Sequence, residues 1–254
     1  MQTENLLMKK LMLVSAALAS SSIPALAADL AVKVPTPPPF AWTGCFLGVH
    51  AGGGWTQKDI TDPVALVEES NAFATPATVV TTARVSPSGA VIGGQFGCDY
   101  QFAPNWVAGV EGSASGSTMK GSTTVALVDV GDTARVTART DFLGSVTGRL
   151  GYAVDRWLYY VRGGAAWAGD KYTVVGNGFG FEGLDTRGGW TVGAGIEWAF
   201  SSNWSARLEY DYYGLGTRTI QMTDSINGFG PGPIDVKQSV QTVKLGVNFH
   251  VWSR

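Results

Sequence analysis

The chain has 254 residues, and its 18 basic and 20 acidic side chains give a formal net charge of −2. This balance provides no general electrostatic attraction to nucleic acid. A hydrophobic content of 45% excludes a disordered chain, and the 34 glycines lack the three-residue period of collagen. After the N-terminal segment, no stretch approaches the roughly 20 apolar residues of a membrane-spanning helix. The composition, rich in glycine and aromatic residues, favours an all-β protein.

The N-terminal segment has the pattern of a secretory signal peptide. A pair of lysines precedes the apolar run 11–18, and Ala25 and Ala27 follow in an A-x-A arrangement. The apolar run is too short for a membrane anchor. We therefore predict a signal peptide over residues 1–27, cleaved near Ala27.

Two start positions, Met1 and Met8, are compatible with this signal peptide. A proline-rich linker is predicted over 28–41, because its consecutive prolines favour a stiff, extended chain. The remaining residues, 42–254, form the predicted barrel domain.

From Trp42 onward, apolar residues recur with a period of two, which is typical of β-strands. Eight such runs can be distinguished. Their approximate ranges are 42–56, 88–102, 106–116, 136–153, 157–169, 188–200, 204–216 and 239–251.

Each run separates into an apolar face and a face that carries the charges. In the fourth run, Val136 and Ala138 share the predicted apolar face with Phe142, and Asp99 of the second run lies on the charged face. The other charges that we expect to form a network on this face are Glu111, Arg139, Asp141, Arg149, Arg162, Glu197, Arg207, Glu209, Asp211 and Lys244.

The connections between the runs alternate between short and long. Residues 103–105, 155–156 and 201–203 form tight turns, whereas the other connections have about eighteen to thirty residues. Outer-membrane barrels have short periplasmic turns and long outer loops. We therefore predict an all-β fold, an eight-stranded antiparallel up-and-down transmembrane β-barrel. A β-sandwich and a soluble lipocalin-like barrel, whose apolar face points inward, are the alternatives.

In a membrane barrel, the apolar face must contact lipid, because lipid offers no hydrogen bonds to polar groups. The charged face then points into the lumen, which eight strands leave just wide enough for side chains to fill. Aromatic residues flank the short turns on the apolar face and predict a girdle at one membrane interface. These residues are Phe102, Trp106, Tyr152, Trp157 and Trp204.

Nearly equal numbers of positive and negative side chains allow the lumen charges to pair. We therefore expect a plugged lumen without a wide pore. The alternative is a gate or a narrow ion path built by Glu111, Arg149, Arg207 and Glu209.

Cys45 and Cys98 are the only two cysteines. An even number in a secreted chain suggests a disulfide, and the two positions fall near the same ends of neighbouring strands. Two free thiols are the alternative. A metal site is not expected, because no histidine cluster accompanies the cysteines.

Five segments have a recognisable pattern: Trp42-Thr43-Gly44-x-Phe46-x-Gly48 and residues 148–153, 160–166, 207–213 and 243–249. Together they resemble the small outer-membrane β-barrel family of Gram-negative bacteria, which has OmpA-like architecture and includes surface antigens and some haem-binding members. The resemblance covers essentially all of the strands and implies insertion by the outer-membrane assembly machinery.

The C-terminus departs from this family. Its members usually end on an aromatic residue that serves as an insertion signal, whereas Val251 occupies that phase here and Trp252 lies in the opposite one.

The sequence offers no catalytic constellation. Neither His50 nor His250 shows a Ser-His-Asp arrangement, so we expect a non-enzymatic, surface-exposed barrel with a role in envelope integrity, without a cofactor or metal. Its expected partners are membrane lipids, lipopolysaccharide and the assembly machinery, but not nucleic acid. The alternative is a narrow channel or a protein that binds or takes up a small ligand such as haem.

Overall fold

The computed structural model describes residues 40–61, 82–127, 132–176, 179–221, 223–224 and 233–251, which belong to one compact unit. The predicted signal peptide, nearly all of the predicted linker and Trp252 lie outside these ranges. Within the described part, no helix is long and apolar enough to cross a membrane.

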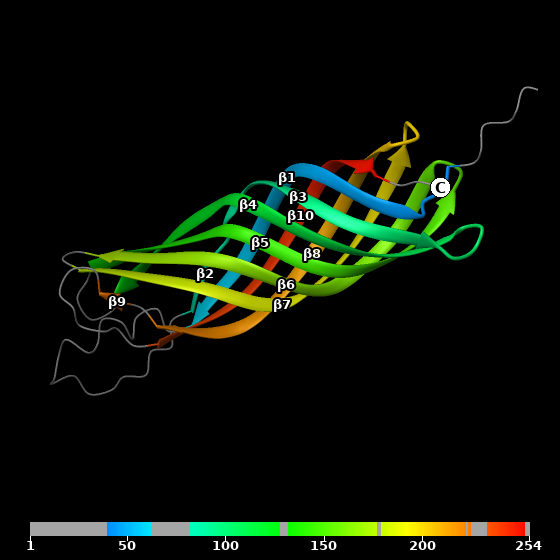
Figure 1. Ribbon diagram of the computed structural model, residues 1–254. Helices are drawn as coiled ribbons and strands as arrows, with labels where there is room; N and C mark the ends of the chain where they lie inside the picture. Colours follow the sequence, from blue (N-terminus) through cyan, green and yellow to red (C-terminus); the bar gives the residue numbers. More distant parts are fainter. Residues whose placement is uncertain are drawn as a thin grey trace, which may run out of the picture. The chain divides into compact units, whose positions relative to one another are not determined.

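Eight long strands follow one another as an antiparallel sheet, and β1 pairs with β10, so the sheet closes on itself (Figure 1). Two short strands, β2 and β9, pair with β1 and β7 at one end. The prediction of an eight-stranded antiparallel barrel is confirmed. The strands are β1 (Gly44–Thr61), β2 (Thr82–Val85), β3 (Ser88–Gln101), β4 (Trp106–Leu127), β5 (Asp132–Val154), β6 (Trp157–Gly176), β7 (Phe179–Ala199), β8 (Trp204–Gln221), β9 (Thr223–Asp224) and β10 (Pro233–His250).

Tight turns join β3 to β4, β5 to β6 and β7 to β8 at the same end of the barrel, here called the turn end. The shortest turn is Asp155-Arg156, in which Asp155 has a φ of 52°. Two-residue hairpins need positive φ values, which aspartate tolerates better than most residues. The opposite end is called the loop end.

The outward face carries a broad band of exposed, large apolar side chains. At the turn end the band is bordered by Phe102, Trp106, Tyr152, Trp157 and Trp204, all of them exposed. Towards the loop end, a second set of exposed aromatic residues that the sequence had not predicted borders the band. On β5 and β6 this second set lies ten residues from the first. Its members are Trp55, Phe142, Trp167 and Trp190.

The height of this band fits the hydrocarbon core of an outer membrane. Trp157 and Trp167 both lie on the outward face of β6. Ten residues of strand extend about 33 Å, which corresponds to about 25 Å of height at the tilt of 35–45° usual in such barrels. We call the region between the two aromatic borders the apolar band.

On β5 beyond the apolar band, charged side chains point outward and apolar side chains point inward. Two sequence predictions are wrong there. Arg139 and Asp141 do not enter the lumen, because their side chains point outward with exposed fractions of 54% and 46%. Val136 and Ala138, predicted on the lipid-facing side, point inward and are buried.

The cause is a bulge in β5. The register between β5 and β6 shifts between Thr140 and Phe142, so Asp141 is an extra residue and the alternation of β5 changes face there. Beyond the membrane, water covers the outside of the barrel. Polar side chains outside and apolar side chains inside are therefore the favoured arrangement.

The inward side chains of β6 show that the interior is layered. Starting from the turn end, Leu158 and Tyr160 belong to a first apolar cluster, and Arg162 belongs to a charged layer. Ala166 and Ala168 belong to a second apolar cluster. Asp170 then belongs to a polar cluster, and Tyr172 and Val174 belong to a third apolar cluster. Side chains from the other strands complete each layer.

Candidate functional site

The charged layer lies inside the apolar band and is the candidate functional site. Nine of the eleven charged residues that the sequence placed on the inward face are buried there. The carboxylates belong to Asp99, Glu111, Glu197, Glu209 and Asp211, and the cations to Arg149, Arg162, Arg207 and Lys244.

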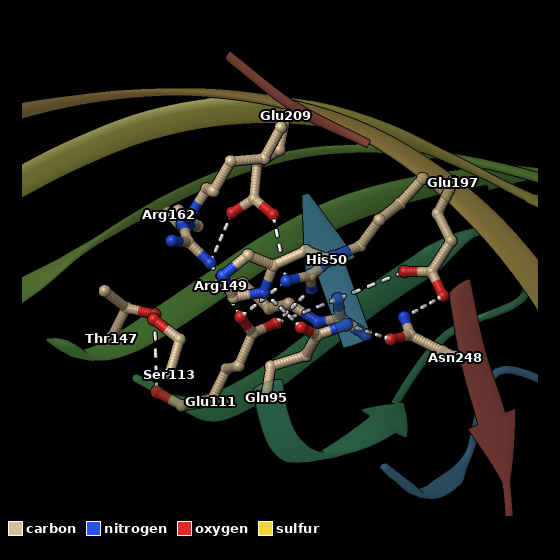
Figure 2. Close-up of polar contacts among 12 residues, drawn as sticks. His50, Gln95, Glu111, Ser113, Thr147, Arg149, Arg162, Glu197, Glu209 and Asn248 are labelled. Carbon is tan, nitrogen blue, oxygen red and sulfur yellow. Dashed lines mark hydrogen bonds and ion pairs between the residues drawn. The ribbon is translucent and has the colours of Figure 1, made fainter. Parts of the chain in front are cut away.

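Glu111 of β4 is the centre of this layer (Figure 2). Its carboxylate accepts hydrogen bonds from Arg207 Nη1 at 2.7 Å and Nη2 at 3.1 Å, and from Arg162 Nη1 at 2.7 Å. Arg149 Nη1 lies 3.7 Å from the same carboxylate. One buried carboxylate thus contacts three guanidinium groups from three other strands.

Arg162 and Arg207 connect Glu111 to further carboxylates. Arg162 donates through Nε and Nη2 to both oxygens of Asp211, at 2.7 and 3.1 Å, and also pairs with Glu209. Arg207 Nη2 lies 3.1 Å from Glu209 Oε2, and Lys244 Nζ lies 2.7 Å from Asp211 Oδ2. Bidentate pairs of this kind fix both partners in position.

Arg149 extends the layer towards the turn end. It donates to Asp99 through Nε at 2.7 Å and pairs with it through Nη2, and its Nη1 donates to Glu197 at 3.2 Å. Its guanidinium also lies over the rings of Phe46 and Tyr160, with distances of 4.5 and 5.2 Å to the ring centroids. These ring contacts provide favourable surroundings for a buried cation.

A chain of neutral polar groups continues from Glu197. Asn248 Nδ2 donates to Glu197 Oε1 at 2.7 Å, and Gln95 Nε2 donates to Asn248 Oδ1 at 2.7 Å. His50 forms hydrogen bonds with Gln95 through Nδ1 and with Ser115 through Nε2. Both ring nitrogens of His50 therefore already have protein partners.

Small residues make room for this layer. Gly193 lies on the inward face of β7, next to Asp211 of β8. A Cβ at position 193 would overlap the Asp211 carboxylate. A larger residue there would displace one side of the Arg162–Asp211 pair.

A second buried polar cluster, which the sequence did not predict, lies beyond the apolar band. Lys58 Nζ donates to Asp170 Oδ1 at 2.8 Å, and Thr140 Oγ1 donates to the same oxygen at 2.6 Å. Arg187 pairs with Asp185 at 2.7 Å and donates to the Tyr172 hydroxyl at 3.0 Å. Asp170, Tyr172, Asp185 and Arg187 fell in a predicted loop, because the strands extend further than their lipid-facing pattern.

Cys45 and Cys98 are directly paired positions of β1 and β3, and the structure joins them in a disulfide. It lies near the turn end, within a few residues of Phe102. Among the residues that the structure describes, no group of three or more histidine, cysteine, aspartate or glutamate side chains is arranged to hold a metal ion.

Comparisons with known proteins place this barrel in a family. The family model described as "Outer membrane protein beta-barrel domain" matches residues 13–249. A 31 kDa outer-membrane immunogenic protein of Brucella melitensis is 31% identical over 257 residues, covering 95% of this chain and 99% of the relative. A 25 kDa outer-membrane immunogenic protein of Brucella ovis is 30% identical over 218 residues, covering 83% and 92%.

One of the solved structures compared shares the barrel architecture. The outer membrane protease OmpT from Escherichia coli matches with a TM-score of 0.50 at 8% identity, covering 82% of this chain and 96% of that one. The outer membrane protein OprG from Pseudomonas aeruginosa matches with a TM-score of 0.45 at 13% identity, covering 83% and 98%. The family model over residues 13–249 and the Brucella relatives, together with a closed antiparallel barrel that has an apolar outer band, show that the chain belongs to the outer membrane protein beta-barrel family.

Proposed function

We propose that this outer-membrane barrel is a non-enzymatic protein with a role in envelope integrity and in presenting loops at the cell surface, and that its lumen is closed. The observation that carries the proposal is the alternation of charged and apolar layers across the lumen. Along the inward face of β6, the charged layer and the second polar cluster, both made of ion pairs, lie between three apolar clusters. A wide aqueous pore has no such apolar cross-sections.

The proposed orientation places the turn end in the periplasm and the loop end outside the cell. Short periplasmic turns and longer outer loops are the usual arrangement of such barrels. Exposed side chains near the loop end, such as those of Arg84 and Arg218, would then face the medium. The proposed partners are the surrounding lipids and lipopolysaccharide, and the assembly machinery that inserts the barrel.

Conductance across planar lipid bilayers tests the closed lumen. The purified, refolded barrel is expected to give no discrete current steps above those of a detergent-only control. Reproducible small steps would instead support the narrow-channel alternative. Large, steady steps of the kind that porins produce would contradict a closed lumen altogether.

A haem titration separates this proposal from ligand uptake through the lumen. Both ring nitrogens of His50 are engaged by Gln95 and Ser115, and Thr56 Oγ1 donates to Met119 Sδ at 3.6 Å. Within the described part of the lumen, these side chains already have partners. We expect no Soret shift on titration of the folded barrel, and a saturable shift that the variant His50→Ala abolishes would overturn this expectation.

A further inference from the structure

Three cations lie side by side on the outer surface of β4, β5 and β6. Lys120 is directly paired with Arg139 between β4 and β5, and Arg139 is directly paired with Lys171 between β5 and β6. All three side chains point away from the interior. We call Lys120, Arg139 and Lys171 the cation row.

Such a row is unfavourable unless an anion offsets it. Side chains at directly paired positions have Cβ atoms about 4.5–5.5 Å apart, and like charges at such positions destabilise a sheet. Arg139 pairs with Asp141, and Lys171 with Glu182 at 3.1 Å. Lys120 has no ion pair within the described ranges, so the row keeps an excess of positive charge.

The opposite side of the loop end has a different arrangement. There, Asp59 of β1 lies between two cations, directly paired with Arg84 of β2 and with Lys237 of β10. The Arg84 Nε to Asp59 Oδ1 distance is 2.7 Å. Cations alternate with an acid in this row, whereas the cation row has three positive charges in succession.

Hydroxyl groups accompany the cation row. Two residues further from the membrane, on the same outward face, Ser122 is paired with Thr137 and Thr137 with Thr173. Arg135 of β5 follows after another two residues and is also exposed. Three hydroxyls between cations can donate hydrogen bonds to the oxygens of a phosphorylated sugar.

The height of the row on the barrel indicates what it meets. Lys171 lies four residues beyond Trp167 on β6, which is about 13 Å along the strand and about 10 Å of height at the usual tilt. Polar headgroups occupy the zone directly outside the hydrocarbon core. In Figure 1, β4, β5 and β6 run side by side towards the loop end, and the strand register makes the three cations direct neighbours across them.

We propose that the cation row and the adjoining hydroxyls bind the phosphorylated sugar headgroup of lipopolysaccharide in the outer leaflet. Its phosphates would neutralise Lys120, Arg139 and Lys171, and its acyl chains would lie against the apolar band below. This proposal rests on the orientation in the proposed function, in which the loop end faces outward.

The test is binding of lipid A with both phosphates to the detergent-solubilised, folded barrel, measured by native mass spectrometry. The wild-type barrel is expected to bind it, and phosphate-free lipid A at least about tenfold more weakly, because phosphate contacts with lysine and arginine are charge-assisted. The variant K120Q/R139Q/K171Q is expected to lose at least about tenfold in affinity for the phosphorylated lipid, for the same reason.

The matched control is R84Q/R218Q/K237Q, which removes three exposed cations from the other side of the loop end. It is expected to bind like the wild type. Equal binding by the cation-row variant, or an equal loss in the control, would overturn the proposal. So would complete displacement of the lipid by millimolar inorganic phosphate, which would assign the row to free phosphate.

Each variant is first checked for the heat-modifiable gel mobility of a folded barrel. Because binding in detergent does not depend on orientation in the cell, it is separable from the proposed function. Labelling of Arg84→Cys, an exposed position of β2 at the loop end and apart from the cation row, by a membrane-impermeant maleimide in intact cells tests the orientation. Labelling is expected, and an Arg84→Cys protein protected in intact cells but reactive after lysis would contradict the outward-facing loop end.

Discussion

Glu111 is the residue whose loss should cost the barrel most. Its carboxylate contacts Arg149, Arg162 and Arg207 in a buried layer. Glu111→Gln keeps the shape of the side chain but removes the charge that these guanidiniums share. Breaking a buried ion pair costs about 3–5 kcal/mol, so we expect a fall of that order in the free energy of unfolding, measured by urea titration in detergent micelles.

Asp141→Asn is the matched control, since Asp141 was predicted for the same network but is exposed. An exposed ion pair contributes about 0–1 kcal/mol, so this variant should unfold at nearly the wild-type urea concentration. Equal losses in Glu111→Gln and Asp141→Asn would contradict the assignment of Glu111 to the lumen and of Asp141 to the outer surface.

For single residues, the sequence predicted the face of a side chain correctly wherever inward and outward positions alternate without interruption. Glu111, Arg149 and Arg207 were placed correctly, because a single charge on the lipid side would be costly. Arg139 was misplaced, because the bulge at Asp141 leaves no mark in composition or period. Val136 and Ala138 are apolar, so the sequence placed them on the lipid-facing side, although they point into the barrel.

Strand β6 crosses the apolar band and continues beyond it, so its outward face offers one position inside the band and another beyond it for comparison. Val161 and Val175 both point outward, with exposed fractions of 59% and 52%. Val161→Arg lies midway between Trp157 and Trp167, where a lipid-facing arginine costs about 2–4 kcal/mol. Val175→Arg lies beyond the band and should change stability by less than about 0.5 kcal/mol, as exposed substitutions do.

Refolding of both variants into lipid vesicles, followed by urea titration, measures this difference. The wild-type barrel and the two variants share all of the inward side chains, so packing is held constant. Similar losses for Val161→Arg and Val175→Arg would show that the two positions do not differ in lipid contact.

The Cys45–Cys98 disulfide joins β1 to β3, two strands separated by a long connection. A disulfide that closes a loop of this size typically contributes about 2–4 kcal/mol by restricting the unfolded chain. We expect the double variant C45S/C98S to lose stability of this order in urea titrations. Reduced wild-type protein should match the double variant, and alkylation of two thiols in untreated wild-type protein would contradict the bond.

The strands were predictable in number and order but not in length. The three tight turns and the exposed apolar positions carried strong signals, because turn residues and lipid contact each restrict sequence. Beyond Trp167, the outward face of β6 carries Lys171 and Thr173, and the inward face carries Tyr172 and Val174 besides Asp170. This arrangement resembles neither the membrane part nor a regular loop, so Asp170 and Arg187 remained hidden in predicted connections.

At the scale of the whole molecule, the environment on each face of the sheet changes near the loop-end border of the apolar band. Within the band, a charged layer lies in the lumen and apolar groups face lipid, whereas beyond it the outer surface carries charges and an apolar cluster that includes Ile60, Tyr172 and Val236 lies in the interior. The same closed sheet is therefore surrounded by lipid along the apolar band and by water beyond it. This account requires lipid contact to end near Trp167 on β6.

Spin labelling along β6 tests this claim most directly. Single cysteines replace Val161, Ala166 and Val175, each carries a nitroxide in vesicle-embedded barrel, and its collisions with oxygen and with a water-soluble nickel chelate are compared. We expect oxygen, which concentrates in lipid, to relax the label at 161, and the nickel chelate to relax the label at 175. Neither reagent is expected to reach the buried position 166. Free access of the nickel chelate to the label at 161 would contradict a lipid-covered apolar band.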